Sequence, residues 1–200
     1  MTVATDLSSA PFSKQLKVRT ETVHEALDQR IMAARPFADR VRYGNFLVVQ
    51  FLFHRDIDAL YDHPALAVLL PDLAERRRLP LIAQDLSDLG LDSPAADSAP
   101  HFAAASIDRS EALGWLYVAE GSNLGAAFLL KAASALGLGE TLGARHLGGH
   151  PDGRGQHWRS FTAALDGLTL TPEGQDGAFA GANAAFMRVR SLVETHLNRD

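Results

Sequence analysis

The chain has 200 residues, which is the length of one domain with a sizeable hydrophobic core. Its net charge of −5 is the sum of 19 basic and 24 acidic residues, and this excludes the strongly basic surface that is typical of nucleic-acid-binding proteins. Because the chain contains no cysteine, disulfides, iron–sulfur clusters, thiolate metal ligation and cysteine nucleophiles are excluded.

Apolar residues recur at helical spacing along most of the chain, and no segment alternates as a strand would. Residues 1–10 are small and polar, so we expect a flexible tail followed by one domain over residues 11–200. The sequence therefore predicts an all-α fold, a compact single-domain bundle of about eight helices. The expected helices are Phe12 to Ala34, Val41 to Tyr61, Ala65 to Arg77, Leu81 to Leu89, a central helix from the cap residue Asp108 to Leu136, Glu140 to Leu147, Gln156 to Leu165 and Pro172 to Leu197, with a loop from Gly90 to Ala103 and a turn from Gly148 to Gly155.

The N-terminal segment lacks the basic and apolar regions of a signal peptide. No apolar run reaches the ~20 residues that a helix needs to span a bilayer. We therefore expect a soluble, cytoplasmic protein that binds neither nucleic acid nor membrane.

The central helix contains two interior glycines, Gly121 and Gly125, with Ser122 and Asn123 between them. A glycine inside a helix costs about 1 kcal/mol relative to alanine, so these positions need a compensating role. Glycines at this spacing lie on one helical face, where they expose the backbone and allow the helix to bend. Such a bare face suits either close packing of another helix or close approach of a flat ligand, and the pattern alone leaves both interpretations open.

Eight histidines raise the question of a metal site, but no His-Glu-x-x-His motif and no pair four residues apart on one expected helix is present. A multi-histidine zinc or non-haem iron site is therefore disfavoured. His24 lies mid-helix beside an apolar stripe, and Asp28 follows one turn later, where its carboxylate can orient the imidazole. His24 is a candidate metal ligand or a satisfied core residue. The other seven lie near helix ends, charged neighbours or loops and are expected to be solvated: His54, His63, His101, His146, His150, His157 and His196.

A flat iron macrocycle can lie between two helices when one helix offers an axial nitrogen ligand and the other an uncovered backbone that allows close approach. A basic residue is also needed to hold its propionates. The candidates are Lys17, two turns before His24, and Arg159, although either can equally be solvated surface. Together these residues predict a planar cofactor between the first and the central helix.

Five segments carry a further pattern: Thr22–Asp28, Gln50–Phe53, Glu111–Lys131, Gly143–Leu147 and Trp158–Phe161. In this order and at these separations they resemble the bacterial haem oxygenases, in particular the branch that includes the Pseudomonas haem-uptake enzyme and the oxygenases associated with bacteriophytochromes. The long central motif is quite specific, whereas the histidine motif alone would be weak.

The resemblance implies a haem-oxygenase-like bundle with haem between a proximal and a distal helix. Haem b would be both substrate and cofactor, and O₂ and electrons would convert it to biliverdin, CO and ferrous iron, for iron acquisition or bilin chromophore supply. The implied partners are a ferredoxin or an NADPH-dependent reductase as electron donor and, for the product, a bacteriophytochrome.

The resemblance also implies roles for individual residues. His24 matches the proximal iron ligand and Asp28 the carboxylate that orients it. Gly121 and Gly125 match the distal glycines whose backbone lies close to the iron-bound ligand, and Tyr117 of the same motif is expected to contact haem. The propionate-binding positions are those of Lys17 and Arg159. A neutral histidine ligand favours oxidation of the porphyrin edge more than a thiolate ligand would.

Two departures from the family matter. Ser122 stands where the mammalian enzymes carry an aspartate that organises water, so proton delivery would depend on water held by the backbone, Ser122 or other polar groups. Lys17 and Ala132 stand where the Pseudomonas uptake enzyme has asparagine and lysine, so the α isomer of biliverdin is expected. The alternatives are a non-catalytic haem carrier or sensor of the same fold and a haem-free helical scaffold.

Overall fold

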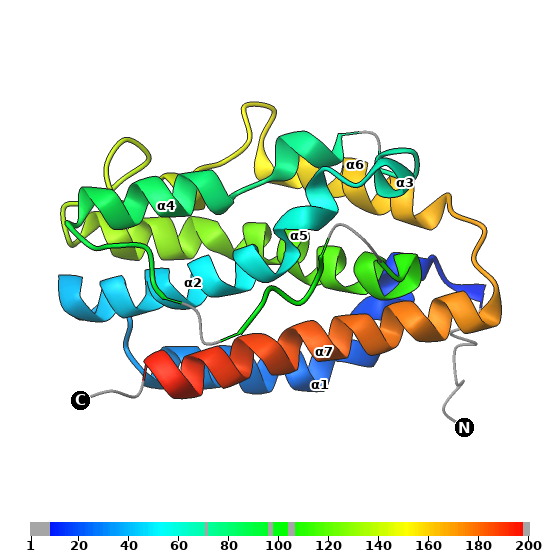
Figure 1. Cartoon of the computed structure of the whole chain (residues 1–200), viewed down its shortest axis with the longest axis horizontal. Helices are drawn as coiled ribbons and strands as arrows, with labels where there is room; N and C mark the ends of the chain where they lie inside the picture. The colour runs from blue at the N-terminus through cyan, green and yellow to red at the C-terminus, as the bar shows by residue number, and fades with distance from the viewer. Residues whose placement is uncertain (1–8, 71, 96–97, 104–106, 198–200) are drawn as a thin grey trace, which may run out of the picture.

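The computed structural model describes residues 9–70, 72–95, 98–103 and 107–197, and throughout these ranges it contains helices and no strand (Figure 1). The all-α prediction is confirmed. Residues 1–8 of the predicted N-terminal tail lie outside the described ranges. The helices are α1 (Phe12–Ala33), α2 (Arg40–Tyr61), α3 (Pro64–Ala67), the 3₁₀ helix η2 (Leu73–Arg76), α4 (Leu79–Asp88), α5 (Arg109–Ser134), the 3₁₀ helix η3 (Arg145–Leu147), α6 (Arg154–Asp166) and α7 (Pro172–His196).

Helices α2, α5 and α7 begin at capping residues that the sequence offers. The Asp108 side chain accepts hydrogen bonds from the backbone N–H groups of Ser110 and Glu111, which would otherwise be unpaired at the start of α5. Thr171 caps α7 in the same way, and Pro172 occupies the first helical position. The boundaries of α1, α2 and α7 agree closely with those expected.

Helix α7 organises the bundle because it packs along both α1 and α5 (Figure 1). The crossing of α5 and α7 is unusually close at two glycines. A Cβ atom added to Gly114 would lie 2.1 Å from the carbonyl oxygen of Ala178, and one added to Gly181 would lie 2.3 Å from that of Glu111. Backbone thus packs directly on backbone at this crossing, which holds the first half of α5 firmly in the core.

Two expected helices are wrong. The stretch predicted as one helix from Glu140 to Leu147 is a tight turn followed by η3, because Gly139 and Leu142 pair their backbone groups and Gly143 has a φ of 72°. The stretch from Ala65 to Arg77 forms two short helices, α3 and η2. Its sequence includes Pro71, which has no N–H to donate and is incompatible with a continuous helix.

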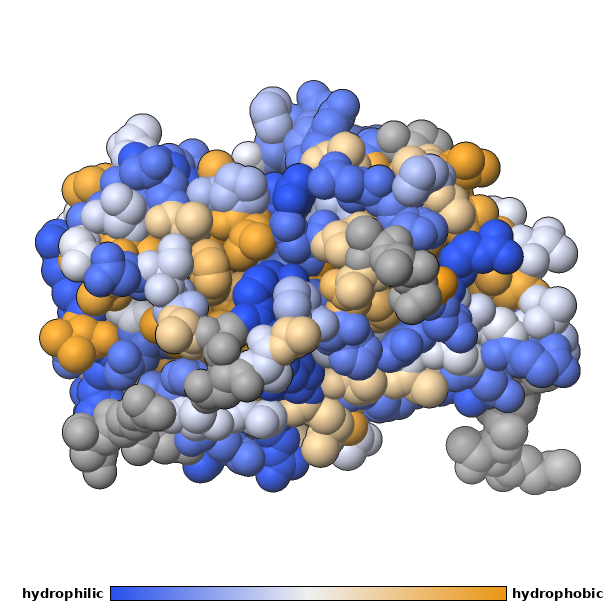
Figure 2. All heavy atoms as spheres, viewed as in Figure 1, coloured by the Kyte–Doolittle hydropathy of each residue, from blue (hydrophilic) through white to orange (hydrophobic). Residues whose placement is uncertain are grey.

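The surface seen with α7 in front mixes hydrophilic and hydrophobic residues (Figure 2). Within the described ranges, none of the helices has the length and apolarity needed to cross a membrane.

Candidate functional site

The first wall of the candidate site is an exposed face of α1. Lys17, His24 and Asp28 all lie on this face. Nε2 of His24 is 3.4 Å from Oδ2 of Asp28, and the two side chains are 58% and 62% exposed. The imidazole ring also packs against Phe186 of α7, with ring centroids 5.3 Å apart. His24 is therefore an oriented surface imidazole and not a core residue, so it is accessible to a ligand's metal.

The second wall is the glycine segment of α5, and its backbone is bare at Gly125. No described atom lies within 4 Å of a Cβ built on Gly125. A Cβ on Gly121 would meet only the Trp158 ring, at 3.6 Å, which is ordinary van der Waals contact. The close helix packing that glycines permit occurs instead at Gly114. The interpretation of Gly125 as a helix-packing glycine is therefore not supported, and the ligand interpretation gains weight.

Two large apolar side chains extend the bare glycine strip along α5. Leu124 is 42% exposed and Phe128 is 80% exposed, and both project from the same side of the helix as Gly121 and Gly125. A phenylalanine this exposed leaves most of its apolar surface in water, which is unfavourable unless something covers it. A strip of backbone flanked by apolar side chains fits the face of a porphyrin ring.

Three aromatic and basic residues lie around the glycine strip or on the helix beside it. Tyr117 is buried and packs against Trp158 at 5.5 Å between ring centroids, so the structure brings Tyr117, Gly121 and Trp158 together. Burial, with a smaller contribution from Asp166, raises the pKa of Tyr117 to about 12. Arg159 is exposed on α6, where it donates to Oε1 of Gln156 at 2.8 Å. Trp158 is the contact that sequence reasoning did not assign to the site.

The hydroxyl of Ser122 is already engaged by its own helix. It donates to the Ala119 carbonyl oxygen at 2.7 Å. Its oxygen can still accept a hydrogen bond, but in this conformation its proton is committed. Ser122 therefore suits holding a water molecule better than donating a proton directly.

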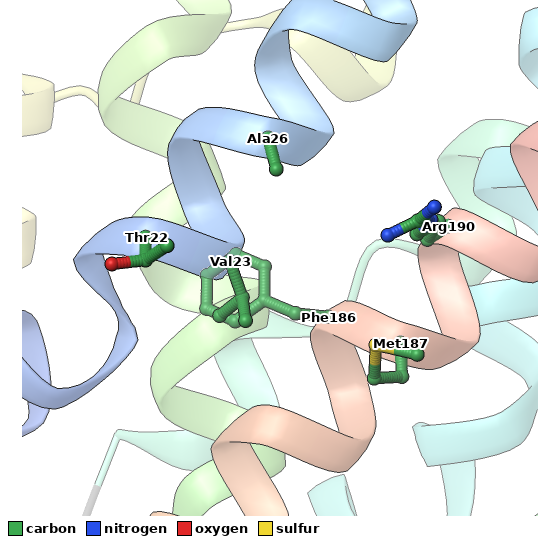
Figure 3. Close-up of a pocket in the computed structure, with 6 residues that line it drawn as sticks. All are labelled: Thr22, Val23, Ala26, Phe186, Met187 and Arg190. Carbon is green, nitrogen blue, oxygen red and sulfur yellow. The ribbon is translucent and has the colours of Figure 1, made fainter.

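Two grooves lie on the surface, and one of them is beside His24, because it is lined by Val23 and by Phe186, the ring on which His24 packs. One has a volume of about 210 Å³ and lies between α1 and α7, where Thr22, Val23 and Ala26 face Phe186, Met187 and Arg190 (Figure 3). The other, of about 220 Å³, lies beside the start of α4 and includes Arg78 and His157. Both are smaller than the roughly 300–1,000 Å³ that is typical of ligand pockets, and neither includes the glycine strip. Across the described part of the chain, no three His, Cys, Asp or Glu side chains gather as a metal site would require.

Two histidines expected to be solvated are buried. His54 is 4% exposed and His146 is 3% exposed. His146 is held by Asp85, whose Oδ2 lies 2.7 Å from its Nδ1, whereas Nδ1 of His54 has no hydrogen-bond partner among the described residues. The sequence did contain a signal for His54, because it lies on the same helical face as Gln50 and Ile57.

A buried ion pair anchors α5 immediately before the glycine strip. Nη1 of Arg76 donates to Oε2 of Glu120 at 2.9 Å, and neither side chain is more than 2% exposed. Nη2 of the same arginine donates to Ser160 and to the His157 carbonyl oxygen of α6. Burial raises the pKa of Glu120, and the Arg76 guanidinium opposes that shift. This network fixes the position of α5 at Glu120, immediately before the glycine strip.

His54 should make the fold sensitive to acid. Burial, followed by the nearby His146 and Arg78, lowers its pKa from 6.5 to about 3, so the folded protein holds it neutral while the unfolded chain protonates it. The stability is therefore complete above pH 6.5 and is lost as the pH falls below that value, by about 2 kcal/mol at pH 5. Urea unfolding of the wild type and of His54→Leu between pH 7.5 and 5 measures this. The variant should show a shallower decline, and an identical pH dependence would contradict the prediction.

Comparison with known proteins places this geometry in context. Residues 10–195 match the family model described as Heme oxygenase. The chain is 44% identical over 182 residues to Heme oxygenase PigA of Pseudomonas aeruginosa, and the alignment covers 91% of each protein. The fold is similar to that of the heme oxygenase from Neisseria meningitidis, solved with NO and CO bound, at a TM-score of 0.89 and 39% identity over 96% of this chain and 94% of the other. The similarity includes both α1 and α5.

Proposed function

Because the chain belongs to the haem oxygenase family, we propose that it binds haem and cleaves the ring with O₂ and electrons to give biliverdin, CO and ferrous iron. The observation that carries the proposal is the pairing of an exposed, oriented His24 on α1 with an uncovered backbone strip at Gly125 on α5. Both helices pack against α6 and α7, which hold the two walls in one body.

Each residue around the proposed haem has a task that its position allows. His24 would ligate the iron through one imidazole nitrogen, and Asp28 would accept a hydrogen bond from the other and so orient the ring. The Gly121–Gly125 backbone would lie against the distal face, where a side chain would block access. Lys17 and Arg159, both exposed, would hold the propionates. When bound, haem supplies the iron that activates O₂ and the carbon edge that is oxidised.

Ser122 and the surrounding backbone would order water at the distal face. The Ser122 oxygen can accept a hydrogen bond, and so can the second lone pair of an exposed backbone carbonyl. Proton transfer would then proceed through ordered water and not from a side-chain acid of α5.

Adding haem to the purified protein tests the proposal directly. A histidine-ligated Soret band is expected, followed under air by biliverdin absorption once ascorbate or a ferredoxin and its reductase supply electrons. A protein that binds haem and leaves its spectrum unchanged under these conditions would be a carrier or sensor. A protein with no Soret band would be a haem-free scaffold.

We predict that the product is predominantly biliverdin IXα. Lys17 is positioned on the exposed face of α1 two turns from His24, and Ala132 adds no cation on α5, so one basic residue on the α1 side should set the haem orientation. Chromatography of the isomers measures this. The paired substitution Lys17→Asn with Ala132→Lys moves the cation from α1 to α5 and should shift the products towards the β and δ isomers. Mainly β and δ product from the wild type would contradict the prediction.

We further propose that residues 11–200 act as one domain and that the protein works in the cytoplasm. The absence of cysteine is compatible with that reducing compartment. The electron donor would be a ferredoxin or an NADPH-dependent reductase. A bacteriophytochrome is the proposed acceptor of the bilin where the role is chromophore supply.

A further inference from the structure

Arg154, the first residue of α6, joins the glycine strip of α5 to the η3 loop. Its Nη1 donates to the carbonyl oxygen of Asn123 at 3.1 Å, and its Nη2 donates to the carbonyl oxygen of Leu147. Asn123 lies midway between Gly121 and Gly125. One guanidinium thus holds the backbone of the proposed distal wall and the backbone of a separate loop at the same time.

The η3 loop, residues 145–149, is also held by a second arginine, Arg78. Nη1 of Arg78 donates to the carbonyl oxygens of His146, at 2.5 Å, and Gly148, at 3.3 Å. Three successive carbonyls therefore accept hydrogen bonds from two arginines. Within the described residues neither arginine forms an ion pair at salt-bridge distance, and their hydrogen bonds go to backbone oxygens. This makes the η3 loop a fixed support against which Arg154 can hold α5.

Helix stability does not account for Arg154. A cation in the first turn of a helix is disfavoured by the helix dipole, and α6 would be better served there by a neutral or acidic residue. The side chain also gains no carboxylate partner. Its contribution must therefore lie in the two carbonyls that it bonds, since hydrogen bonds from a charged donor are the stronger kind.

A guanidinium bound to a carbonyl inside a helix changes the local geometry. An inserted donor competes with the N–H one turn later for the same oxygen, and helices bend where this happens, most readily beside glycines. Asn123 has a glycine two residues to either side. The point at which Arg154 acts is therefore the most compliant part of α5.

We propose that Arg154 is a positioning residue for the distal wall: by tying the Asn123 carbonyl to the η3 loop, it sets the position of the α5 backbone at Gly121–Gly125 and so its distance from haem. This inference rests on the haem site proposed above. The two carbonyls are bonded by two different nitrogens of the planar arginine fork, whereas lysine has one terminal nitrogen on a shorter side chain and is not expected to bridge both. Arg154→Lys therefore keeps the charge and removes the bridge, and Arg154→Gln removes both.

Hydrogen–deuterium exchange of the haem-free protein tests the contact without reference to haem. Arg154→Lys and Arg154→Gln should exchange the amides of residues 121–129 faster than the wild type, by about tenfold. The matched control is Arg40→Lys, which likewise removes an arginine donor from a backbone carbonyl, that of Leu136 beyond the end of α5, and does not involve the η3 loop or residues 121–129. It should leave the exchange of residues 121–129 unchanged. Unchanged exchange of α5 in both Arg154 variants would overturn the proposal.

The haem complex then tests the consequence. The C–O stretching band of the ferrous CO complex should shift or broaden in Arg154→Lys and remain in place in Arg40→Lys, and the isomer purity of biliverdin should fall in the first variant alone. Faster α5 exchange with an unaltered CO band and unaltered isomers would also overturn the positioning role. Failure of the wild type to bind haem would instead refute the proposed function, and the exchange result would still show whether Arg154 holds α5.

Discussion

Replacing His24 by alanine is expected to abolish conversion of haem to biliverdin. The His24 imidazole is the ligand that α1 exposes to the proposed haem, with Asp28 at 3.4 Å to orient it. Without it, haem can still associate with the apolar strip of α5, where Phe128 is 80% exposed, but the iron lacks its protein ligand. Biliverdin absorption should therefore remain at background. Added imidazole should restore part of the turnover, because it can occupy the space left by the missing side chain.

Two variants calibrate this result. Asp28→Asn keeps a hydrogen-bonding side chain but removes the negative charge, and loss of such an orienting partner typically costs roughly 10–100-fold in affinity or activity. His101→Ala removes another exposed histidine, which pairs with Glu111 and is not part of either wall, and should leave the Soret band and turnover unchanged. Wild-type turnover in His24→Ala would remove His24 from the site, whatever the two other variants show.

The parts of the molecule that local sequence determines were predictable. The apolar periodicity predicts α1, α2, α5 and α7 to within a few residues. The starts of α5 and α7 are the sharpest, because the Asp108 and Thr171 side chains accept hydrogen bonds from the first backbone N–H groups of these helices. The glycine pair in α5 was visible for the same reason, since the cost of an interior glycine makes it conspicuous. Which surface the glycines face was not visible, because that depends on which helices pack where.

The errors arose where distant segments decide the outcome. The turn at Gly143 depends on a positive φ and on an Asp88 carboxylate that accepts from its N–H, and that residue lies 55 positions away. The Arg76–Glu120 pair joins residues 44 positions apart. The charged neighbours Arg55 and Asp56 make His54 resemble a surface residue in the sequence. Its burial in α2 shows that its helical face is the better guide.

The glycines of α5 divide into two kinds, and this division explains how one helix serves both the core and the site. Gly114 packs backbone against α7, whereas Gly125 has open space in front of it. The first kind stabilises the fold by allowing close approach, and the second kind leaves room for a ligand. Alanine at each position should therefore have opposite effects on stability.

Gly114→Ala is expected to destabilise the protein strongly. The new methyl group would lie 2.1 Å from the Ala178 carbonyl oxygen and 2.4 Å from the Ala182 nitrogen, both of them backbone atoms that cannot rotate away, so α5 and α7 must separate. Overpacking of this kind costs about 1–3 kcal/mol or more, which exceeds the gain of about 1 kcal/mol in helix propensity. Thermal unfolding should show a Tm several degrees lower, and an unchanged Tm would contradict the observed crossing.

Gly125→Ala is the matched substitution on the same helix and should behave in the opposite way. Its methyl group meets no described atom within 4 Å, so α5 keeps the full propensity gain and the Tm should rise by about 2–4 °C. The same methyl group would project into the proposed haem face, so haem affinity and turnover should fall, and Gly125→Leu should lower both further. Thermal melts of the haem-free variants and haem titrations measure the two effects separately. A Gly125→Leu protein that binds haem as the wild type does would show that the strip faces something other than haem.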